Sequence, residues 1–338
     1  MNIIGSLQRT GVAAMVLLLA ASVAWGQTDD RTKLIEAAKK EGKLVWYTST
    51  NVTESKPLLD DFEKAYGIRG EIFRASGEKT LNRIVTEGRA GRWDFDVVTI
   101  SEVDALMDAK LLGSYRSPEA RSYIPEFKDA NGYWTAVYVN YATIGYNTKL
   151  VSEKEAPKQW EDLLDPKWKS NISIDQEQYS WYGTLHKAWG RERAQRYMRA
   201  IAKQDIQWRK GHTLIAQLMS AGEFPLGVVY AHRTEEMKTR GAPIEWVNTV
   251  NPLVVTLNSA GISNKPQHPN VARVFIDFLL SRPAQQRLRT LRRIPARPDI
   301  EPFSPRMEQS KLKLVTNPVE TGAQFNATIK EFRETFGL

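Results

Sequence analysis

The sequence of 338 residues contains no cysteine. Disulfides, thiolate nucleophiles and cysteine ligands for metal ions are therefore excluded, and so is a lipid anchor on an N-terminal cysteine. The chain also lacks a G-x-S-x-G elbow, an H-E-x-x-H pair, a Walker loop and a Rossmann glycine fingerprint. Its four histidines lie far apart in the sequence. These absences favour a binding protein over an enzyme.

Long hydrophobic runs are also missing, except at the N-terminus. There an apolar stretch over 12–23 follows Arg9, and it is too short for a comfortable membrane span. Ala24 and Gly26 supply the small residues that a signal peptidase reads. We therefore expect a signal peptide over residues 1–26 and export of the mature protein to the periplasm.

Basic residues exceed acidic ones, and the net charge of +8 falls to +7 when Arg9 leaves with the signal peptide. Such an excess favours an anionic ligand or a membrane surface, although it also fits a plain solvated surface. Basic residues are concentrated at 191–199 and 282–297. Neither segment has the interleaved aromatics of a nucleic-acid groove, so no nucleic-acid partner is expected.

Strand and helix patterns alternate along the first third of the chain. Apolar, β-branched runs at 44–47, 68–73 and 94–100 are separated by helical patterns at about 54–65 and 76–91. This alternation is typical of a doubly wound α/β sheet.

A second such unit is expected over 141–256, after a long alternating segment at 133–147 that we expect to cross between two lobes. We assign 27–140 plus 257–300 to an N-terminal lobe, and 141–256 plus 301–338 to a C-terminal lobe. The end of the chain should be helical and pack against one lobe.

Polar and aromatic residues follow the predicted strands where each strand ends. The carboxyl ends of parallel strands and the N-termini of the helices after them are where open α/β sheets bind ligands. No nucleophile–base pair stands among these residues, which favours binding over catalysis. The predicted ligand-binding residues are Tyr47, Ser49, Thr50, Asn51, Ser101, Glu102, Gln178, Tyr179, His212, Thr213, Tyr230, His232 and Arg233. For Glu102 a helix cap is the simpler interpretation.

Several longer motifs carry a family resemblance over nearly the whole mature chain. They are LIEAAKKEGKLVWYTS, SGEKTLNRIVTEG before DFDVVTISE, DPKWKSNISI, QLMSAGEFPLGVVY, NSAGIS, and VFIDFLLSRPAQQRL before RRIPARPD. With them the chain resembles the periplasmic solute-binding proteins of ABC importers, in the ferric-ion-binding branch. The resemblance implies a two-lobed fold, each lobe a mixed, mostly parallel sheet flanked by helices, with the ligand cleft between the lobes. It also implies a monomer that delivers its ligand to an ABC permease in the inner membrane, without enzymatic activity.

The ligand positions depart from the ferric pattern. Ferric-binding relatives place two adjacent tyrosines where this chain has Ala231 and His232, with Tyr230 just before. Their first-loop histidine appears as Asn51, and their carboxylate falls at Ser101 or, with a shift of one residue, at Glu102. Ferric iron favours anionic oxygen ligands, which Asn51 and Ser101 do not supply.

We therefore expect a small polar or anionic solute. The alternative is Fe³⁺ or an iron complex as the transported ligand, bound by Tyr230, His232 and Glu102. No resident cofactor is expected. A secreted α/β hydrolase and a chemoreceptor partner are the other function classes that stay open.

Overall fold

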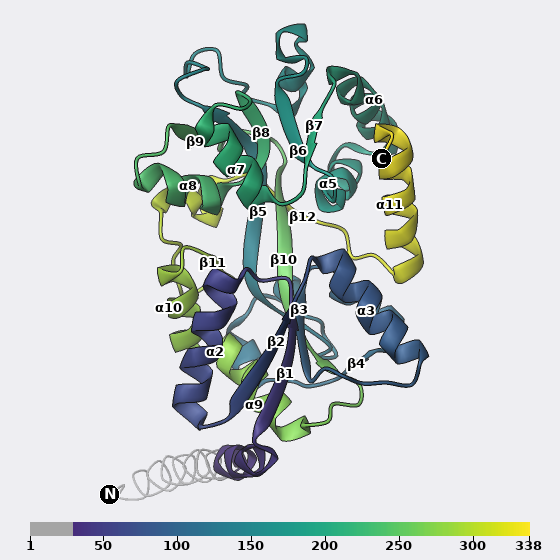
Figure 1. Cartoon of the computed structure of the whole chain (residues 1–338), viewed down its shortest axis with the longest axis vertical. Helices are drawn as coiled ribbons and strands as arrows, with labels where there is room; N and C mark the ends of the chain where they lie inside the picture. Colours follow the sequence, from purple (N-terminus) through teal and green to yellow (C-terminus); the bar gives the residue numbers. More distant parts are fainter. Residues whose placement is uncertain (1–29) are drawn as a thin grey trace, which may run out of the picture.

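The computed structural model describes residues 30–338, so the predicted signal peptide lies outside the described residues. Two lobes lie one above the other, joined by two long strands that run between them (Figure 1). Residues 30–41 form a first helix. In the N-terminal lobe the elements are β1 (Lys43–Thr48), α2 (Val52–Tyr66), β2 (Arg69–Arg74), α3 (Gly77–Arg89), β3 (Val97–Ile100), α4 (Val103–Asp108), β4 (Leu112–Gly113), α9 (Pro269–Leu280) and α10 (Arg282–Thr290).

The other lobe repeats the strand–helix alternation. Its elements are β6 (Ile172–Asp175), α5 (Tyr179–Trp189), α6 (Arg191–Ile201), β7 (Gln207–Arg209), α7 (His212–Ala221), β8 (Leu226–Tyr230), α8 (Ala231–Thr239) and β9 (Ile244–Trp246). The linking elements are β5 (Thr135–Asn147), β10 (Leu253–Ser263), β11 (Ile294–Pro295), β12 (Leu314–Thr316) and α11 (Gly322–Phe336).

One continuous path of strands runs through both lobes in the order β2-β1-β3-β10-β5-β8-β6-β7. β1 pairs in parallel with β2 and β3, and β6 pairs in parallel with β7 and β8. β5 and β10 pair antiparallel from Ala142 and Val254 to Thr135 and Ala260, and every residue of both strands is buried. The predicted mixed, mostly parallel two-lobed fold and its crossing strand are confirmed.

The N-terminal lobe is centred on aromatic residues that position the cleft loops. The Trp46 ring packs edge-on against Phe275 of α9 at 5.0 Å, and Phe275 meets Phe62 of α2 at 4.9 Å. Such pairs contribute about 0.5–1.5 kcal/mol beyond the area they bury. The Trp46 indole N–H donates to the Thr99 hydroxyl at 2.9 Å, which ties the ends of β1 and β3 together. The loops after these strands are thereby held side by side at the cleft.

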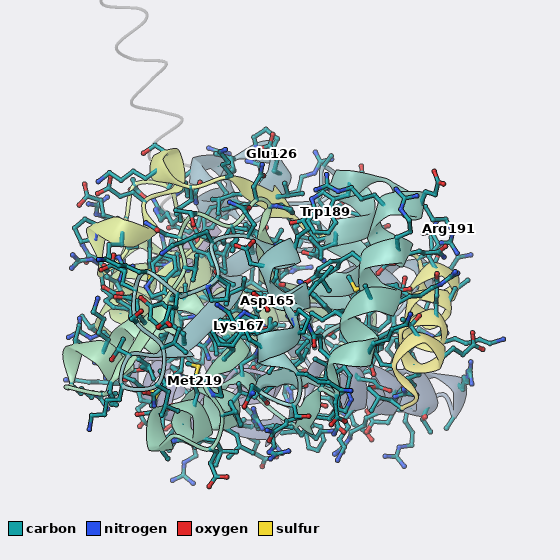
Figure 2. The ribbon with its side chains drawn as sticks, turned by 90° about the horizontal axis from the view of Figure 1, so that it is seen from above. Glu126, Asp165, Lys167, Trp189, Arg191 and Met219 are labelled. Atoms are coloured by element: carbon teal, nitrogen blue, oxygen red, sulfur yellow. The ribbon has the colours of Figure 1, made fainter. Side chains whose placement is uncertain are left out.

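The end of the chain differs from the prediction. Helix α11 was expected to pack against one lobe, but it contacts α5 and α6 of the C-terminal lobe and also α4 of the other. Arg191 at the start of α6 donates to Glu331 of α11 at 3.1 Å, and it lies beside this helix in Figure 2. An amphipathic helix buries its apolar stripe wherever a face is free, and no sequence pattern says on which lobe. The lobe boundaries assigned from the sequence stay a prediction.

Within the described residues, no helix combines the length and apolarity needed to cross a membrane.

Candidate functional site

A cleft with a volume of 740 Å³ lies between the lobes, and most of the predicted site residues line it. These are Ser49, Asn51, Ser101, Glu102, Tyr179, His212, Thr213, Tyr230 and His232. Because the strand ends that carry them are aligned in one sheet, residues more than 180 positions apart in sequence meet at this cleft.

Four predicted residues do not line the cleft. Tyr47 points into its own lobe, where its hydroxyl donates to Glu87 at 3.1 Å, because side chains alternate along β1. Thr50 is buried and its hydroxyl bonds to that of Tyr138 at 3.2 Å, and Gln178 is buried as well. Arg233 is engaged by Glu54, with 2.7 Å between Nη2 and Oε1. The strand ends were located correctly, but the direction of each side chain was not readable from the sequence.

The rim formed by the N-terminal lobe carries two cations that sequence reasoning missed. Arg74 at the end of β2 donates from Nη2 to the Asn51 amide oxygen at 2.9 Å, and Lys79 lies in the first turn of α3. Both side chains are exposed and line the cleft. Among the described residues, neither has a carboxylate partner. Their positive charge is therefore available to a ligand.

Three helices begin at the cleft without a side-chain cap. Asn51, Gly211 and Tyr230 stand at the N-caps of α2, α7 and α8, and none of these three residues supplies a side-chain acceptor to its helix, although the N–H of Gly211 itself donates to Asp175. Gly211 has φ 107°, a left-handed conformation that favours glycine. Helix N-termini leave N–H groups without intrahelical partners and attract negative charge. The cleft is therefore suited to an anion.

The C-terminal side of the cleft is a neutral aromatic wall beside a carboxylate. The ring of His212 lies 3.7 Å from that of Tyr230. Burial lowers the pKa of His212 and raises the pKa of Tyr230, which keeps both rings uncharged. Asp175 accepts the backbone N–H groups of Gly211 at 2.8 Å and Glu177 at 2.9 Å. Its charge is thus largely satisfied within the protein.

Glu102 stands between the two sides. It occupies the N-cap position of α4, but its side chain makes no cap hydrogen bond, so the helix-cap interpretation does not describe its carboxylate. The carboxylate lies against Gly77, where an added Cβ would come within 2.2 Å of Oε2. Oε2 is buried without a hydrogen-bond partner. Burial, and then the charges of Glu177 and Glu78, raise the pKa of Glu102 to about 7.

The floor of the cleft comes from the crossing strands and from the residue before β11. Tyr138, Asn140, Asn258 and Arg293 line it, and sequence reasoning missed all four. Each asparagine is an amide inside a long strand made mainly of apolar, aromatic and hydroxyl-bearing residues, which was the signal that could have located it. Arg293 belongs to the basic run at 282–297, and nothing in that run distinguishes it from its exposed neighbours.

A ferric ion in this cleft would have few anionic donors. Within residues 30–338, no group of three or more histidine, aspartate or glutamate side chains is placed to hold a metal ion. The predicted ligand His232 has its Nε2 engaged by Arg293 at 3.1 Å. Tyr230 would have to lose a proton whose pKa burial has raised. The donor set fits a transported iron ion poorly.

Comparison with known proteins gives consistent results. The family model of the bacterial extracellular solute-binding proteins matches residues 58–313. The chain is 22% identical to an Fe(3+)-binding periplasmic protein of Serratia marcescens over 75% of its length and 78% of that protein. It is 24% identical to a putative 2-aminoethylphosphonate-binding periplasmic protein of Salmonella typhi, over 85% of this chain and 84% of that one.

The similarity extends to solved structures. The periplasmic binding protein AfuA from Actinobacillus pleuropneumoniae, with exogenous fructose-6-phosphate bound, superposes with a TM-score of 0.80 at 24% identity. That match covers 88% of this chain and 99% of AfuA. Because the family model covers most of the chain, and because the fold and the interlobe cleft agree with it, this protein belongs to the bacterial extracellular solute-binding proteins.

Proposed function

We propose that the cleft captures a small organic anion bearing a phosphoryl or phosphonyl group and delivers it to the permease of an ABC importer. The observation that carries this proposal is the pair of cations without carboxylate partners, Arg74 and Lys79, beside the N-terminus of α2, whose N-cap residue Asn51 makes no side-chain cap. A phosphorus oxyanion offers only acceptor oxygens and negative charge. Guanidinium groups and free backbone N–H groups are the donors that recognise it.

The names of two relatives support this choice of ligand class. AfuA was solved with fructose-6-phosphate, and the Salmonella protein is named for putative 2-aminoethylphosphonate binding. Both ligands join a phosphorus oxyanion to a small polar body. In this chain the neutral wall of His212 and Tyr230 and the carboxylate of Asp175 would face such a body.

Capture of the solute requires no covalent bond to form or break. A solute that contacts both lobes stabilises the closed arrangement, because only that arrangement makes both sets of contacts. The N-terminal rim would hold the anionic group, and the C-terminal wall the remainder. The permease would then distinguish the loaded, closed protein from the empty one. The solute should be recovered from the protein chemically unchanged, as expected for a solute-binding protein without enzymatic activity.

Ferric iron is the second candidate, favoured by the names of relatives such as the Serratia protein and by the presence of Tyr230 in the cleft. Iron bound by a phenolate absorbs visible light. Iron binding therefore predicts a coloured protein that loses its colour in the Tyr230→Phe variant, whereas anion capture predicts a colourless protein at all times.

Titration calorimetry with matched ligands tests the proposal. Fructose-6-phosphate and 2-aminoethylphosphonate are the probes, and fructose is the control that lacks the charged group. We expect at least one probe to bind at least about 100-fold more tightly than fructose, because two charge-assisted hydrogen bonds contribute about 1.5–3 kcal/mol each. Affinity for both probes no greater than that for fructose, or saturable binding of Fe³⁺ with a visible band, would overturn the proposal.

The working location and assembly follow the same proposal. The protein would act in the periplasm as a monomer, after removal of residues 1–26. Intact mass spectrometry of the exported protein should give the mass of a chain beginning at Gln27. Light scattering should give the mass of a single chain. A dimer, or a mature form that keeps the first residues, would contradict these expectations.

A further inference from the structure

A buried polar cluster joins the floor of the cleft to both lobes. From Arg293, Nη1 lies 3.1 Å from His232 Nε2 and 3.1 Å from Asn140 Oδ1, while Nη2 lies 3.3 Å from Glu54 Oε2. The guanidinium also stacks over the ring of Tyr138 at 4.6 Å. Arg293 is 5% exposed and His232 is 1% exposed, and both line the cleft.

We propose that Arg293 fixes His232 as the neutral tautomer protonated on Nδ1, and so makes it a hydrogen-bond donor to an anionic oxygen of the solute and not a metal ligand. This inference rests on the proposed function for the identity of the acceptor. The tautomer itself does not depend on any ligand.

The tautomer follows from what a guanidinium can do. Arginine has five N–H donors and no acceptor, and it keeps its charge in proteins. The contact between Nη1 and His232 Nε2 is therefore a hydrogen bond only if Nε2 accepts. A neutral imidazole carries one proton, which must then be on Nδ1. Burial, followed by the charges of Arg293 and Arg233, lowers the pKa of His232, which agrees with a neutral ring.

The Nδ1 atom of His232 has no hydrogen-bond partner among residues 30–338, although it is buried. A buried donor left without an acceptor destabilises the protein, because it has lost its hydrogen bonds to water. Such groups are rare in folded proteins, and an unpaired one calls for an explanation. Because His232 lines the cleft, an acceptor oxygen of the bound solute would remove this destabilisation. The empty protein would thus hold a donor prepared for an oxyanion.

The same arrangement works against a metal ion. Nε2 is occupied by a cation, and Nδ1 holds the proton that coordination would have to displace. A bound ferric ion would also lie close to the buried guanidinium of Arg293. In this position histidine therefore selects acceptor groups and rejects cations, although histidine is by itself a common metal ligand.

Nitrogen NMR of the ligand-free protein tests the tautomer. With ¹⁵N-labelled histidine the chain has four imidazoles, and the His232→Phe variant identifies the signals of His232. We expect Nδ1 with the shift of a protonated nitrogen and Nε2 with that of an unprotonated one. Arg293→Met should release the ring to a mixture of tautomers. The matched control is Arg292→Met, the same change in an exposed neighbour, which should leave the signals of His232 unchanged.

Calorimetry with fructose-6-phosphate tests the donor. We expect His232→Phe to bind about 10- to 100-fold more weakly than the wild type, since a hydrogen bond to a charged acceptor is lost. A wild type that binds this probe, with a variant within threefold of it, would overturn the donor role alone. A wild type that binds no anionic probe would overturn the donor role together with the proposed function. A proton on Nε2 in the NMR spectrum would overturn the tautomer, whatever binds.

Discussion

The buried charges beside the floor of the cleft, Glu54, Arg233 and Arg293, here called the hinge side, are arranged differently from the charges on the N-terminal rim. On the hinge side, Glu54 of the N-terminal lobe contacts Arg233 of the other lobe at 2.7 Å and Arg293 at 3.3 Å. All three side chains are buried or nearly so. On the rim, Arg74 and Lys79 are exposed, and among the described residues neither forms an ion pair with a carboxylate.

This difference separates two uses of charge in one cleft. Where positive and negative groups are paired inside the protein, little charge is left for a ligand, and the pairing instead holds the lobes together. Where cations stand without partners, a ligand must supply the negative charge. The charged pairs of the hinge side should therefore govern stability, whereas the affinity contributed by charge should come from the rim.

The largest effect is expected for Glu54→Gln. The change keeps the shape but removes the carboxylate that two buried arginines share. Breaking a buried ion pair from one side typically costs about 3–5 kcal/mol, because a charge is left without compensation. Denaturant unfolding should therefore show a loss in the free energy of unfolding of about that size. The matched control is Glu71→Gln in the same lobe, whose partner Lys43 is exposed, with an expected change below about 1 kcal/mol. Equal losses in the two variants would remove the basis of the comparison.

The second largest effect is expected for Arg74→Gln, and it is a loss of affinity for the solute. Removal of an unpaired guanidinium should weaken binding of fructose-6-phosphate by about 10- to 100-fold, because a charge-assisted hydrogen bond contributes about 1.5–3 kcal/mol. The free energy of unfolding should change by less than about 0.5 kcal/mol, as for most exposed positions. Calorimetry and denaturant unfolding measure the two quantities.

Lys210→Gln is the matched control for that experiment, since Lys210 also lines the cleft but is paired with Glu177. Its loss should weaken binding by less than about threefold, because its charge is already balanced. If Lys210 proves more important than Arg74, the anionic group of the solute lies on the C-terminal side.

Much of the fold was predictable because periodicity and strand composition report burial directly. The runs at 44–47 and 94–100 became β1 and β3, and the alternating segment at 133–147 became the crossing strand β5. The packing of α11 was not predictable, since an apolar pattern does not reveal that the helix contacts elements of both lobes. Local sequence patterns determine whether a segment forms a helix or a strand, whereas tertiary contacts determine which other elements it packs against.

For the site, the sequence indicated the loops but not the charges. Strand ends placed Asn51, His212 and Tyr230 at the cleft. Arg74 and Arg293 were indistinguishable from the many other basic residues, because only three-dimensional pairing shows which cation lacks a partner and which is buried. Arg233 was predicted to contact the ligand because it stands at a helix start just after a strand end, and it pairs instead with Glu54 and Glu236.

A smaller effect on stability is expected when a change of pH ionises Glu102. Its pKa of about 7 in the folded protein lies above the ordinary value of 4.5, so between these values the folded chain keeps a proton that the unfolded chain has released. The contribution of Glu102 to stability should therefore fall as the pH rises from 5 to 8, whereas His212 and His232, whose pKa values burial lowers, act in the opposite direction in the acid part of this interval. Asp104, whose pKa burial raises to about 6, and Glu320, whose pKa burial also raises, act in the same direction as Glu102.

The neutral variant Glu102→Gln should lose less stability over that interval than the wild type, by an amount on the order of 1 kcal/mol after allowance for solvent in the cleft. Thermal unfolding at both pH values measures the difference. An identical pH dependence in the two proteins would mean that Glu102 is ionised without penalty. It would then act as a negative charge beside the anion subsite at neutral pH.

The smallest effect is expected for Arg333→Ala, which tests a contact between the lobes on the exposed rim. Arg333 of α11 lies 3.1 Å from Glu78 of α3 and 3.2 Å from the hydroxyl of Tyr179, and its side chain is 46% exposed. Water and salt screen such a pair, so its loss should change the free energy of unfolding by only a few tenths of a kcal/mol. The same protein would then contain two ion pairs between its lobes whose contributions differ about tenfold, and burial would be the reason. A loss as large as that of Glu54→Gln would instead show that α11 fastens the lobes together, and the stabilising role assigned to the hinge side would belong to the C-terminal helix.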